Sequence, residues 1–360
     1  MVSERTVYQI HQADGAFEQL ESHLRAAGFF SAAGDDGRCA DVYLGYGLSE
    51  VFRRTSRPAR PEPAALPLAA CHIRAADAPG PKATAPFHLG EWERTWLAED
   101  YARAVSGARA AIAAGEVYQV NLVQHLSAPF AGDADGVARA LRAFSPLHSR
   151  PLHGPGWSIV SATPELFLQR AGRRIRTMPI KGTRPRGEAL ELSRSTKDAA
   201  EHVMIVDLER NDLGQICEPG SVAWPALMET RRLAGVEHLV STVEGTARED
   251  LGLAETLTAL FPGGSVTGAP KIAALDHINA LEPVGRGASM GALGTIWPNG
   301  DFELALTIRT FAIVDGRIHL WVGGGVVWDS DPAAEVEESW VKARPLLDAL
   351  RAASGARVAA

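Results

Sequence analysis

The sequence predicts an α+β protein built on antiparallel β-sheets, and three observations carry this prediction. Apolar and polar residues alternate from Phe302 to Arg309, which indicates a half-buried strand that places Arg309 on the face away from the aliphatic row. Asp315-Gly316 then predicts a hairpin turn into a returning strand through Val322. Helical patterns fall between groups of strands, an order typical of α+β folds.

The first part of the chain is the least regular. Residues 1 to about 50 carry no strong motif, and the segment from Arg53 to Pro86 contains seven prolines. Proline-rich stretches disfavour regular structure, so this segment is predicted to be a poorly regular connection. We therefore expect a short N-terminal lobe over residues 1–90, a core over residues 91–351 and a frayed tail over residues 352–360.

The core shows the clearest periodicity. Apolar residues at helical spacing predict a helix from Leu97 to Ile112, which Gly115 ends. The remaining elements are predicted from the same two periodicities: strands over 117–126, 157–160 and 165–169, helices over 193–213 and 253–261, a turn-rich segment over 262–271 that leads into a helix, and a last helix over 332–351.

Composition narrows the classes of partner and compartment. The 360 residues are 46% hydrophobic and carry a formal net charge of -7, which argues against nucleic acid or an anionic membrane as the main partner. The N-terminus leads into no apolar signal segment, and we find no apolar run that could span a bilayer. Three scattered cysteines predict neither a disulfide framework nor a metal cluster, so we expect a cytoplasmic protein.

Several charged residues are candidates for chemistry. Glu335, Glu338 and Lys342 share one face of the last helix, and Asp198 shares a face with Glu201 on an earlier one. Such faces are usually solvated ion pairs, but two helices could also donate carboxylates to one Mg²⁺. Spacing alone does not choose between these interpretations.

Arginine and glycine form a second candidate group. Three successive glycines, Gly323 to Gly325, weaken a strand unless something must approach its backbone closely, and Arg309 could join that backbone in binding a carboxylate. A bulge beside a surface arginine explains the pattern equally well. Glu165 is either a solvated strand-edge carboxylate or a buried acid, and the sequence alone favours the solvated edge. His238 is more often structural than catalytic at such a position.

Lysine is rare in this chain, since only 5 of its 36 basic residues are lysines. One of them, Lys181, stands in a tight loop between Pro179 and Pro185. A loop lysine is nearly always only solvated, yet arginine cannot replace lysine where a neutral amine is needed.

Six motifs together resemble the chorismate-utilising enzymes, which include anthranilate, aminodeoxychorismate, isochorismate and salicylate synthases. The resemblance covers roughly residues 95 to 350. It implies antiparallel sheets in a sandwich-like core with helices packed outside. The motifs that carry it are Tyr118-Gln119-Val120-Asn121-Leu122, Pro179-Ile180-Lys181-Gly182-Thr183-Arg184-Pro185-Arg186, Asp207-Leu208-Glu209-Arg210-Asn211-Asp212, Gly263-Gly264-Ser265-Val266-Thr267-Gly268-Ala269-Pro270-Lys271, Thr307-Ile308-Arg309 and Gly323-Gly324-Gly325.

The resemblance implies roles for these residues. Glu201 and Glu338 would bind Mg²⁺, with Asp198 and Glu335 in or near its shell through water, and the metal would orient the ring carboxylate of chorismate. Glu165 would protonate the departing hydroxyl, and His238 would face the reacting ring. The other implied substrate-binding positions are Gln119, Gly182, Thr183, Ser265, Thr267, Arg309 with Gly323, Gly324 and Gly325 around the enolpyruvyl carboxylate, and Lys342 beside the metal.

Two positions predict the reaction. Relatives that add water have a lysine at the position of Gln119, and glutamine cannot act as that base. Anthranilate synthases usually have alanine at the position of Lys181, whereas lysine there is typical of aminodeoxychorismate synthase component I, as is the order Ser265-Val266-Thr267. The lysine would attack C2 and expel the C4 hydroxyl, and ammonia would then enter at C4 and expel the lysine.

The predicted product is therefore 4-amino-4-deoxychorismate, and the ammonia is expected from a separate glutamine amidotransferase subunit. An anthranilate-type synthase and a non-catalytic chorismate-binding homologue remain the alternatives. Ser289 stands where family members commonly carry a tyrosine that helps to hold a carboxylate, which keeps the second alternative open.

Overall fold

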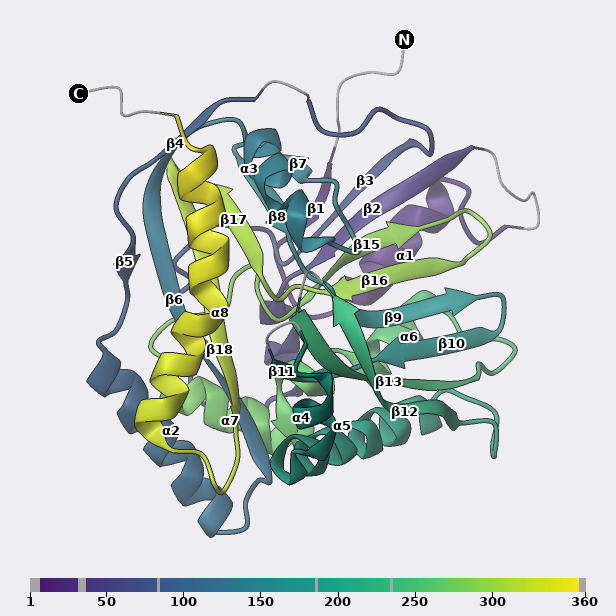
Figure 1. Ribbon diagram of the computed structural model, residues 1–360. Helices are drawn as coiled ribbons and strands as arrows, with labels where there is room; N and C mark the ends of the chain where they lie inside the picture. Colours follow the sequence, from purple (N-terminus) through teal and green to yellow (C-terminus); the bar gives the residue numbers. More distant parts are fainter. Residues whose placement is uncertain (1–6, 32–36, 83–84, 185–186, 234–235, 356–360) are drawn as a thin grey trace.

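Two antiparallel β-sheets pack against each other and enclose the main hydrophobic core (Figure 1). The structure is a computed structural model that describes residues 7–31, 37–82, 85–184, 187–233 and 236–355. The core draws apolar side chains from both sheets, such as Val42 and Leu293 from one and Leu122 and Trp321 from the other. The predicted sandwich-like α+β fold is thus confirmed.

The larger sheet has ten strands in the order β1-β3-β2-β15-β16-β9-β10-β13-β11, with β12 paired to β13 beside that path. Its pairings are antiparallel throughout the described residues. The bounds are β1 Tyr8–Ile10, β2 Arg38–Leu44, β3 Ala69–Ala75, β9 Leu166–Ala171, β10 Arg174–Met178, β11 Ile180–Arg184, β12 Ala223–Leu233, β13 Val236–Thr246, β15 Ala292–Ile296 and β16 Phe302–Leu306.

The smaller sheet has eight strands, ordered β14-β6-β18-β17-β8-β7, with β4 and β5 paired to β6. Its hairpin of β17 and β18 turns at Asp315 and Gly316, whose φ angles of 51° and 69° are those of a tight hairpin turn. The bounds are β4 Phe87–Leu89, β5 Glu93–Arg94, β6 Gln119–Gly132, β7 Leu152–Gly154, β8 Trp157–Ser161, β14 Gly268–Ala269, β17 Thr310–Val314 and β18 Arg317–Val326.

Helices cover the outer faces of both sheets. A second core lies between the eight-stranded sheet and the helices α3 and α8, where Leu320 and Val322 meet Leu346 and Leu350. None of the described helices combines the length and the apolar character needed to cross a bilayer. The helical bounds are α1 Ala16–Ala26, η1 Tyr46–Phe52, α2 Ala98–Ala113, α3 Ala134–Leu141, η2 Arg142–Phe144, α4 Ala189–Arg194, α5 Thr196–Gly214, α6 Leu253–Leu260, η3 Gly264–Val266, α7 Lys271–Leu281 and α8 Pro332–Ala353.

Two predictions about the elements need correction. The alternation from Phe302 to Arg309 is not one strand, because β16 ends at Leu306 and Arg309 has a φ of 50° before β17 begins in the other sheet. The proline-rich segment contains a regular strand, β3. The N-terminal part of the chain also contributes to the larger sheet, in which residues 40–44 of β2 pair with β15.

Arg286 and Glu282 form a buried ion pair that connects β6 with η3. The Nε and one terminal nitrogen of Arg286 donate to the two oxygens of Glu282, at 2.9 and 2.7 Å. The guanidinium also donates to the carbonyls of Val266 and Asn121, at 2.9 and 2.6 Å, and lies 4.5 Å from the centre of the Tyr46 ring. This arginine thereby holds η3 against β6.

We expect Arg286→Met to lower the free energy of unfolding by about 3–5 kcal/mol, because it leaves the Glu282 carboxylate buried without its cation. Arg286→Lys should lose less, since it keeps the charge but not the two-pronged geometry. Urea unfolding of each variant measures the change. Arg344→Met, which removes an exposed pair with Glu337, is the control and should be unchanged; an equal effect in both would contradict the role of the buried pair.

Candidate active site

Lys181 on β11 lies in a largely buried position between two elements. Its ammonium donates to the carbonyl oxygen of Ser265 in η3 at 3.2 Å and lies 3.3 Å from Oε1 of Glu201 on α5. Only 11% of the side chain is exposed. Lysines in loops are usually solvated, so the burial of this one departs from what its sequence context predicts. The structure therefore brings together Lys181, Ser265 and Glu201, three of the predicted site residues.

Glu165 lies beside Lys181 and is 3% exposed. Its Oε1 accepts from the backbone N–H of Ile180 at 3.3 Å. Burial raises the pKa of the Glu165 carboxyl, although the Lys181 ammonium, the Ser265 hydroxyl and Arg309 all act to lower it. Glu165 is thus a buried acid and not the solvated strand-edge carboxylate that the sequence alone favours, and the group keeps its proton to a higher pH than an ordinary glutamate.

Gln119 opens β6 and is completely buried against the glycine strand β18. Its amide nitrogen donates to Oε1 of Glu201 at 3.3 Å. A Cβ atom at Gly325 would lie 1.9 Å from that amide nitrogen and 3.0 Å from Glu201 Oε1. Any side chain at this position would displace Gln119, which explains physically why glycine stands here.

The preceding glycines face helix α8. The ammonium of Lys342 donates to the carbonyl oxygen of Gly323 at 2.9 Å and pairs with Glu338 at 2.8 Å. A Cβ atom at Gly324 would lie 3.2 to 3.4 Å from Lys342, Glu338 and Glu335. Glu335 is buried and accepts from the Ser330 hydroxyl at 2.7 Å. The predicted close approach to the glycine backbone is therefore made by the charged face of α8.

Carboxylates of two helices thus converge on neighbouring glycines, Glu201 from α5 at Gly325 and Glu338 with Glu335 from α8 at Gly324. Within the described ranges, no three His, Cys, Asp or Glu side chains stand close enough to form a ready-made metal centre. Mg²⁺ needs only one or two protein carboxylates besides waters and ligand oxygens, so this donor set fits that ion. The side chain of Asp198 lies outside the described residues, and the metal role stays a prediction.

Arg309 lies in the break between β16 and β17, close enough to Glu165 for each charge to act on the other. Burial lowers the pKa of its guanidinium, while Glu165 raises it. In the described part of the chain this half-buried guanidinium makes no hydrogen bond and no ion pair, although a cation withdrawn from water normally has a partner. An anionic ligand would supply the missing partner.

His238 on β13 reaches the same region through Gly182. Its Nδ1 lies 3.1 Å from the carbonyl oxygen of Gly182, which has a φ of 62°. Burial lowers the pKa of His238, as Arg309 also does, while the Gly182 carbonyl raises it. A neutral imidazole is consequently favoured in this position.

Three further residues singled out in the sequence carry hydroxyl groups. The Thr267 hydroxyl donates to the Gly263 carbonyl at 2.9 Å, inside the turn that precedes β14. The Ser289 hydroxyl is completely buried and donates to the Thr307 carbonyl at 3.2 Å. The side chain of Thr183 lies outside the described residues. Both hydroxyls that can be described therefore hold protein backbone.

Two buried residues of this region have no predicted role. His202, next to Glu201 on α5, has its Nε2 2.6 Å from the Ser241 hydroxyl, and burial followed by the Lys181 charge lowers its pKa to about 4. Glu209, two turns further along α5, lies under η3 beside Asp212, which pairs with Lys271 at 2.6 Å. Both residues lie on α5. Apolar residues do not recur at helical spacing along this helix, so the sequence does not indicate which of its faces is buried.

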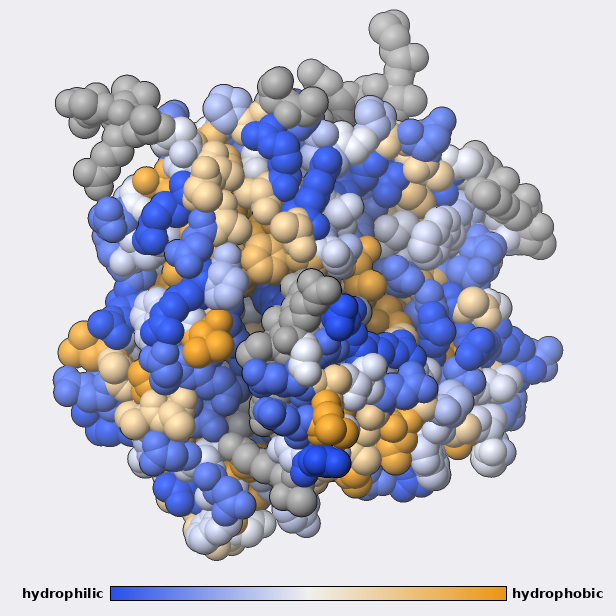
Figure 2. Space-filling view, in the orientation of Figure 1, coloured by the Kyte–Doolittle hydropathy of each residue, from blue (hydrophilic) through white to orange (hydrophobic). Residues whose placement is uncertain are grey.

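Charged and polar residues cover most of the described part of the face that carries α8 and α4, and a hollow opens near its centre (Figure 2). The exposed apolar residues of these helices, Val341 and Leu190, stand singly, which is ordinary for a protein surface. Beneath this face the site combines a buried amine, a buried acid, an unpaired guanidinium and converging carboxylates. Such a set can bind a ligand with two negative charges and can provide both a proton donor and a nucleophile.

Comparisons with known proteins agree with this chemistry. Residues 46–348 match the family described as chorismate binding enzyme. The chain is 41% identical over 276 residues to anthranilate synthase component 1 of Streptomyces coelicolor, covering 74% of this chain and 54% of that protein. It is 40% identical over 268 residues to aminodeoxychorismate synthase component 1 of Klebsiella aerogenes, covering 72% and 59%. The chain thus spans little more than half the length of these relatives.

The fold has solved counterparts. The crystal structure of anthranilate synthase component I from Streptococcus pneumoniae aligns with a TM-score of 0.83, over 96% of this chain and 92% of that one, at 23% identity. A structure of a 2,3-dihydroxybenzoate-specific isochorismate synthase from Bacillus anthracis aligns with a TM-score of 0.74 at 24% identity. At these identities the likeness concerns the fold.

Glu209 gives a prediction for stability. Its pKa is raised by burial and by Asp212, so ionising it costs folding free energy of about 1.4 kcal/mol for each unit of the shift. An acid with a raised pKa in the folded state is neutral in both states at low pH and destabilises the fold increasingly as pH rises from its unfolded toward its folded pKa. Glu209→Gln should therefore gain melting temperature over the parent between pH 5 and pH 9, as thermal unfolding would record. A difference independent of pH would contradict this assignment.

Proposed function

The chain belongs to the chorismate binding enzyme family, and from this premise we propose that it replaces the ring hydroxyl of chorismate with an amino group, as an aminodeoxychorismate synthase component 1. Its relatives bear the names of both anthranilate synthase component 1 and aminodeoxychorismate synthase component 1. The observation that carries our choice is Lys181, an amine held in a largely buried place beside the acid Glu165.

Lys181 acts as the nucleophile in this proposal. Attack on carbon requires a neutral amine, which arginine could not supply. The amine adds at C2, the ring double bonds shift, and the C4 hydroxyl leaves. Ammonia then adds at C4, the double bonds shift back, and the lysine leaves as a free amine. The product is 4-amino-4-deoxychorismate, with water as the balance of the hydroxyl and one proton.

Glu165 supplies the proton for the departing hydroxyl. A hydroxide is a poor leaving group, so its departure needs an acid that still holds a proton at neutral pH. Burial raises the pKa of the Glu165 carboxyl, which favours the protonated acid. The pKa of His238 is lowered, so that histidine is neutral and serves as a hydrogen-bonding neighbour of the ring rather than as a charge.

The substrate's two carboxylates need two cationic or hydrogen-bonding sites. Arg309, whose half-buried guanidinium has no partner within the described residues, would bind the enolpyruvyl carboxylate together with the backbone of Gly323 to Gly325. Mg²⁺, held by Glu201 and Glu338, would neutralise and orient the ring carboxylate. Gln119 offers no base for water, which supports amination over hydration.

Ammonia would come from a glutamine amidotransferase subunit, because the name component 1 of the relatives implies a second component. An anthranilate-type synthase is the alternative that would use the same clamps without the lysine step. Incubating the protein with chorismate, Mg²⁺ and ammonium and identifying the product by mass, then by conversion to 4-aminobenzoate with a lyase, decides between them. Failure to consume chorismate at all would leave only a binding role.

Lys181→Ala removes the covalent step and leaves both carboxylate clamps in place. We expect formation of the 4-amino product to fall by about a hundred-fold or more, since ammonia must then displace the hydroxyl without the prior lysine adduct. The 2-amino product should appear as ammonia enters at the vacated C2. Lys181→Arg keeps the charge but should be equally inactive, whereas Lys82→Ala, at an exposed lysine, should retain parental activity.

If Lys181→Ala forms the 4-amino product at the parental rate, as measured by mass, the nucleophilic role is excluded. It would also remove the reason to prefer this activity to anthranilate synthesis.

The magnesium proposal is tested by replacing one carboxylate at a time. Glu201→Gln and Glu338→Gln should each raise the Mg²⁺ concentration needed for half-maximal turnover at least ten-fold, because an amide loses the charge that binds the cation. Glu337→Gln, next to Glu338 but paired with Arg344 on the exposed side of α8, is the matched control. Undiminished turnover of the parent in excess chelator would refute the metal role.

A further inference from the structure

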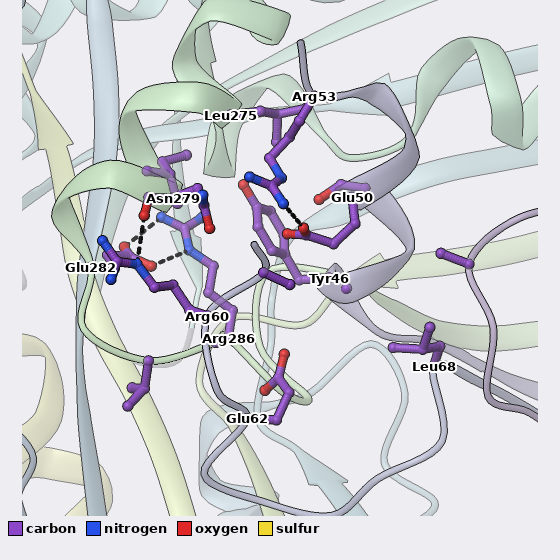
Figure 3. Close-up of a pocket in the computed structure, with 17 residues that line it drawn as sticks. Tyr46, Glu50, Arg53, Arg60, Glu62, Leu68, Leu275, Asn279, Glu282 and Arg286 are labelled. Atoms are coloured by element: carbon purple, nitrogen blue, oxygen red, sulfur yellow. Dashed lines mark hydrogen bonds and ion pairs between the residues drawn. The ribbon is translucent and has the colours of Figure 1, made fainter. Parts of the chain in front are cut away.

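A separate cavity of about 300 Å³ lies between η1, α7 and the proline-rich segment (Figure 3). It shares no lining residue with the site around Lys181, and none of the roles proposed above uses it. The proline-rich segment is fixed there because the Gly285 N–H donates to the carbonyl of Pro61 at 2.9 Å. A segment expected to be an irregular connection is thus the wall of a cavity.

Six charged residues line the cavity, and four of them are already paired. Glu50 pairs with Arg53, and Glu282 pairs with Arg286. The two that remain are Arg60 and Glu62, which stand on either side of Pro61 and form no ion pair with each other or with another described residue (Figure 3). The lining therefore presents one uncompensated cation and one uncompensated carboxyl group.

Both remaining groups are held in place by backbone contacts. Arg60 donates to the carbonyls of Asn279 and Ala280 at the end of α7, at 2.6 and 2.8 Å, so its charge is fixed at the cavity wall. Glu62 accepts from the Gly287 N–H at 2.9 Å, and a Cβ atom at Gly285 would lie 2.2 Å from its Oε1. Their positions are therefore set by the fold before any ligand arrives.

The rest of the lining is apolar or offers further hydrogen-bonding groups. Leu68, Leu275 and Ile278 provide aliphatic walls. Ser49 is 1% exposed, and its hydroxyl, like Nε of Arg53, finds no hydrogen-bond partner among the described residues. Such orphaned polar atoms are rare in native structures and mark a place where a partner is missing.

We propose that this cavity binds a small amino-carboxylate with an apolar body, its carboxylate at Arg60 and its amino group at Glu62. A guanidinium selects carboxylates, and an unpaired carboxyl group accepts from an amine. The burial that raises the pKa of Glu62 to about 7, with like-charged Glu50 also raising it, is relieved when an amine engages it. Free α-amino acids and aromatic aminobenzoates share this chemistry.

Isothermal titration of the full chain, without chorismate, tests the proposal independently of turnover. The probes are L-leucine and 4-aminobenzoate, which carry both groups, against benzoate and benzylamine, which carry one each. We expect at least one two-group compound to bind about ten-fold or more tightly than either one-group compound, as the loss of one hydrogen bond to a charged group predicts. The probe that binds more tightly, L-leucine or 4-aminobenzoate, shows whether the cavity prefers an α-amino acid or an aromatic aminobenzoate.

Variants place the binding in the cavity. Arg60→Gln and Glu62→Gln should each weaken the better probe about ten-fold, while Arg60→Lys, which keeps the charge, should weaken it less. Arg54→Gln, at an exposed arginine outside the lining, is the matched control and should bind as the parent does. The proposal is overturned if no two-group compound binds up to millimolar concentration, if one group suffices for equal affinity, or if both charge-removing variants bind normally.

Discussion

The buried fork of Arg286 on Glu282 is the interaction on which the geometry of the site depends. It lies at the end of α7, yet it holds the carbonyls of Asn121 in β6 and Val266 in η3. These segments carry Gln119 and Ser265, which contact Glu201 and Lys181. A guanidinium is suited to this position because its donors point along fixed directions, so four bonds fix the spacing between strand and turn. The active-site residues inherit that spacing.

Glycine sets the second constraint. At β18 the backbone, rather than a side chain, is the surface that polar groups approach: the neutral amide of Gln119 near Gly325, and the charged groups of Lys342, Glu338 and Glu335 near Gly324. A strand with side chains there would keep these groups several ångströms further from the sheet. The cost is a strand with little intrinsic preference for its conformation, and it is offset because β18 pairs along ten positions with β6.

The sequence predicted the regular elements better than the places where they end. The hairpin at Asp315-Gly316 and the helices α2 and α8 follow from local rules of turn chemistry and periodicity, so they could be predicted. Arg309 could not be placed in this way, because alternation continues through the point where the chain leaves one sheet for the other. The burial of Lys181, the burial of His202 and the cavity at Arg60 depend on contacts between distant segments, which no local pattern encodes.

Glu201 links the proposed chemistry of the site to its charge balance. Its Oε1 lies 3.3 Å from the Lys181 ammonium and accepts from the amide of Gln119. Its negative charge can also attract a divalent cation. Only the neutral amine of a lysine is a nucleophile, so a lysine that attacks carbon must give up its pairing with this carboxylate. A cation that engages Glu201 weakens that pairing, since one carboxylate cannot satisfy both charges fully. In the proposed function, a cation held at Glu201 would therefore also weaken the hold on the amine of Lys181.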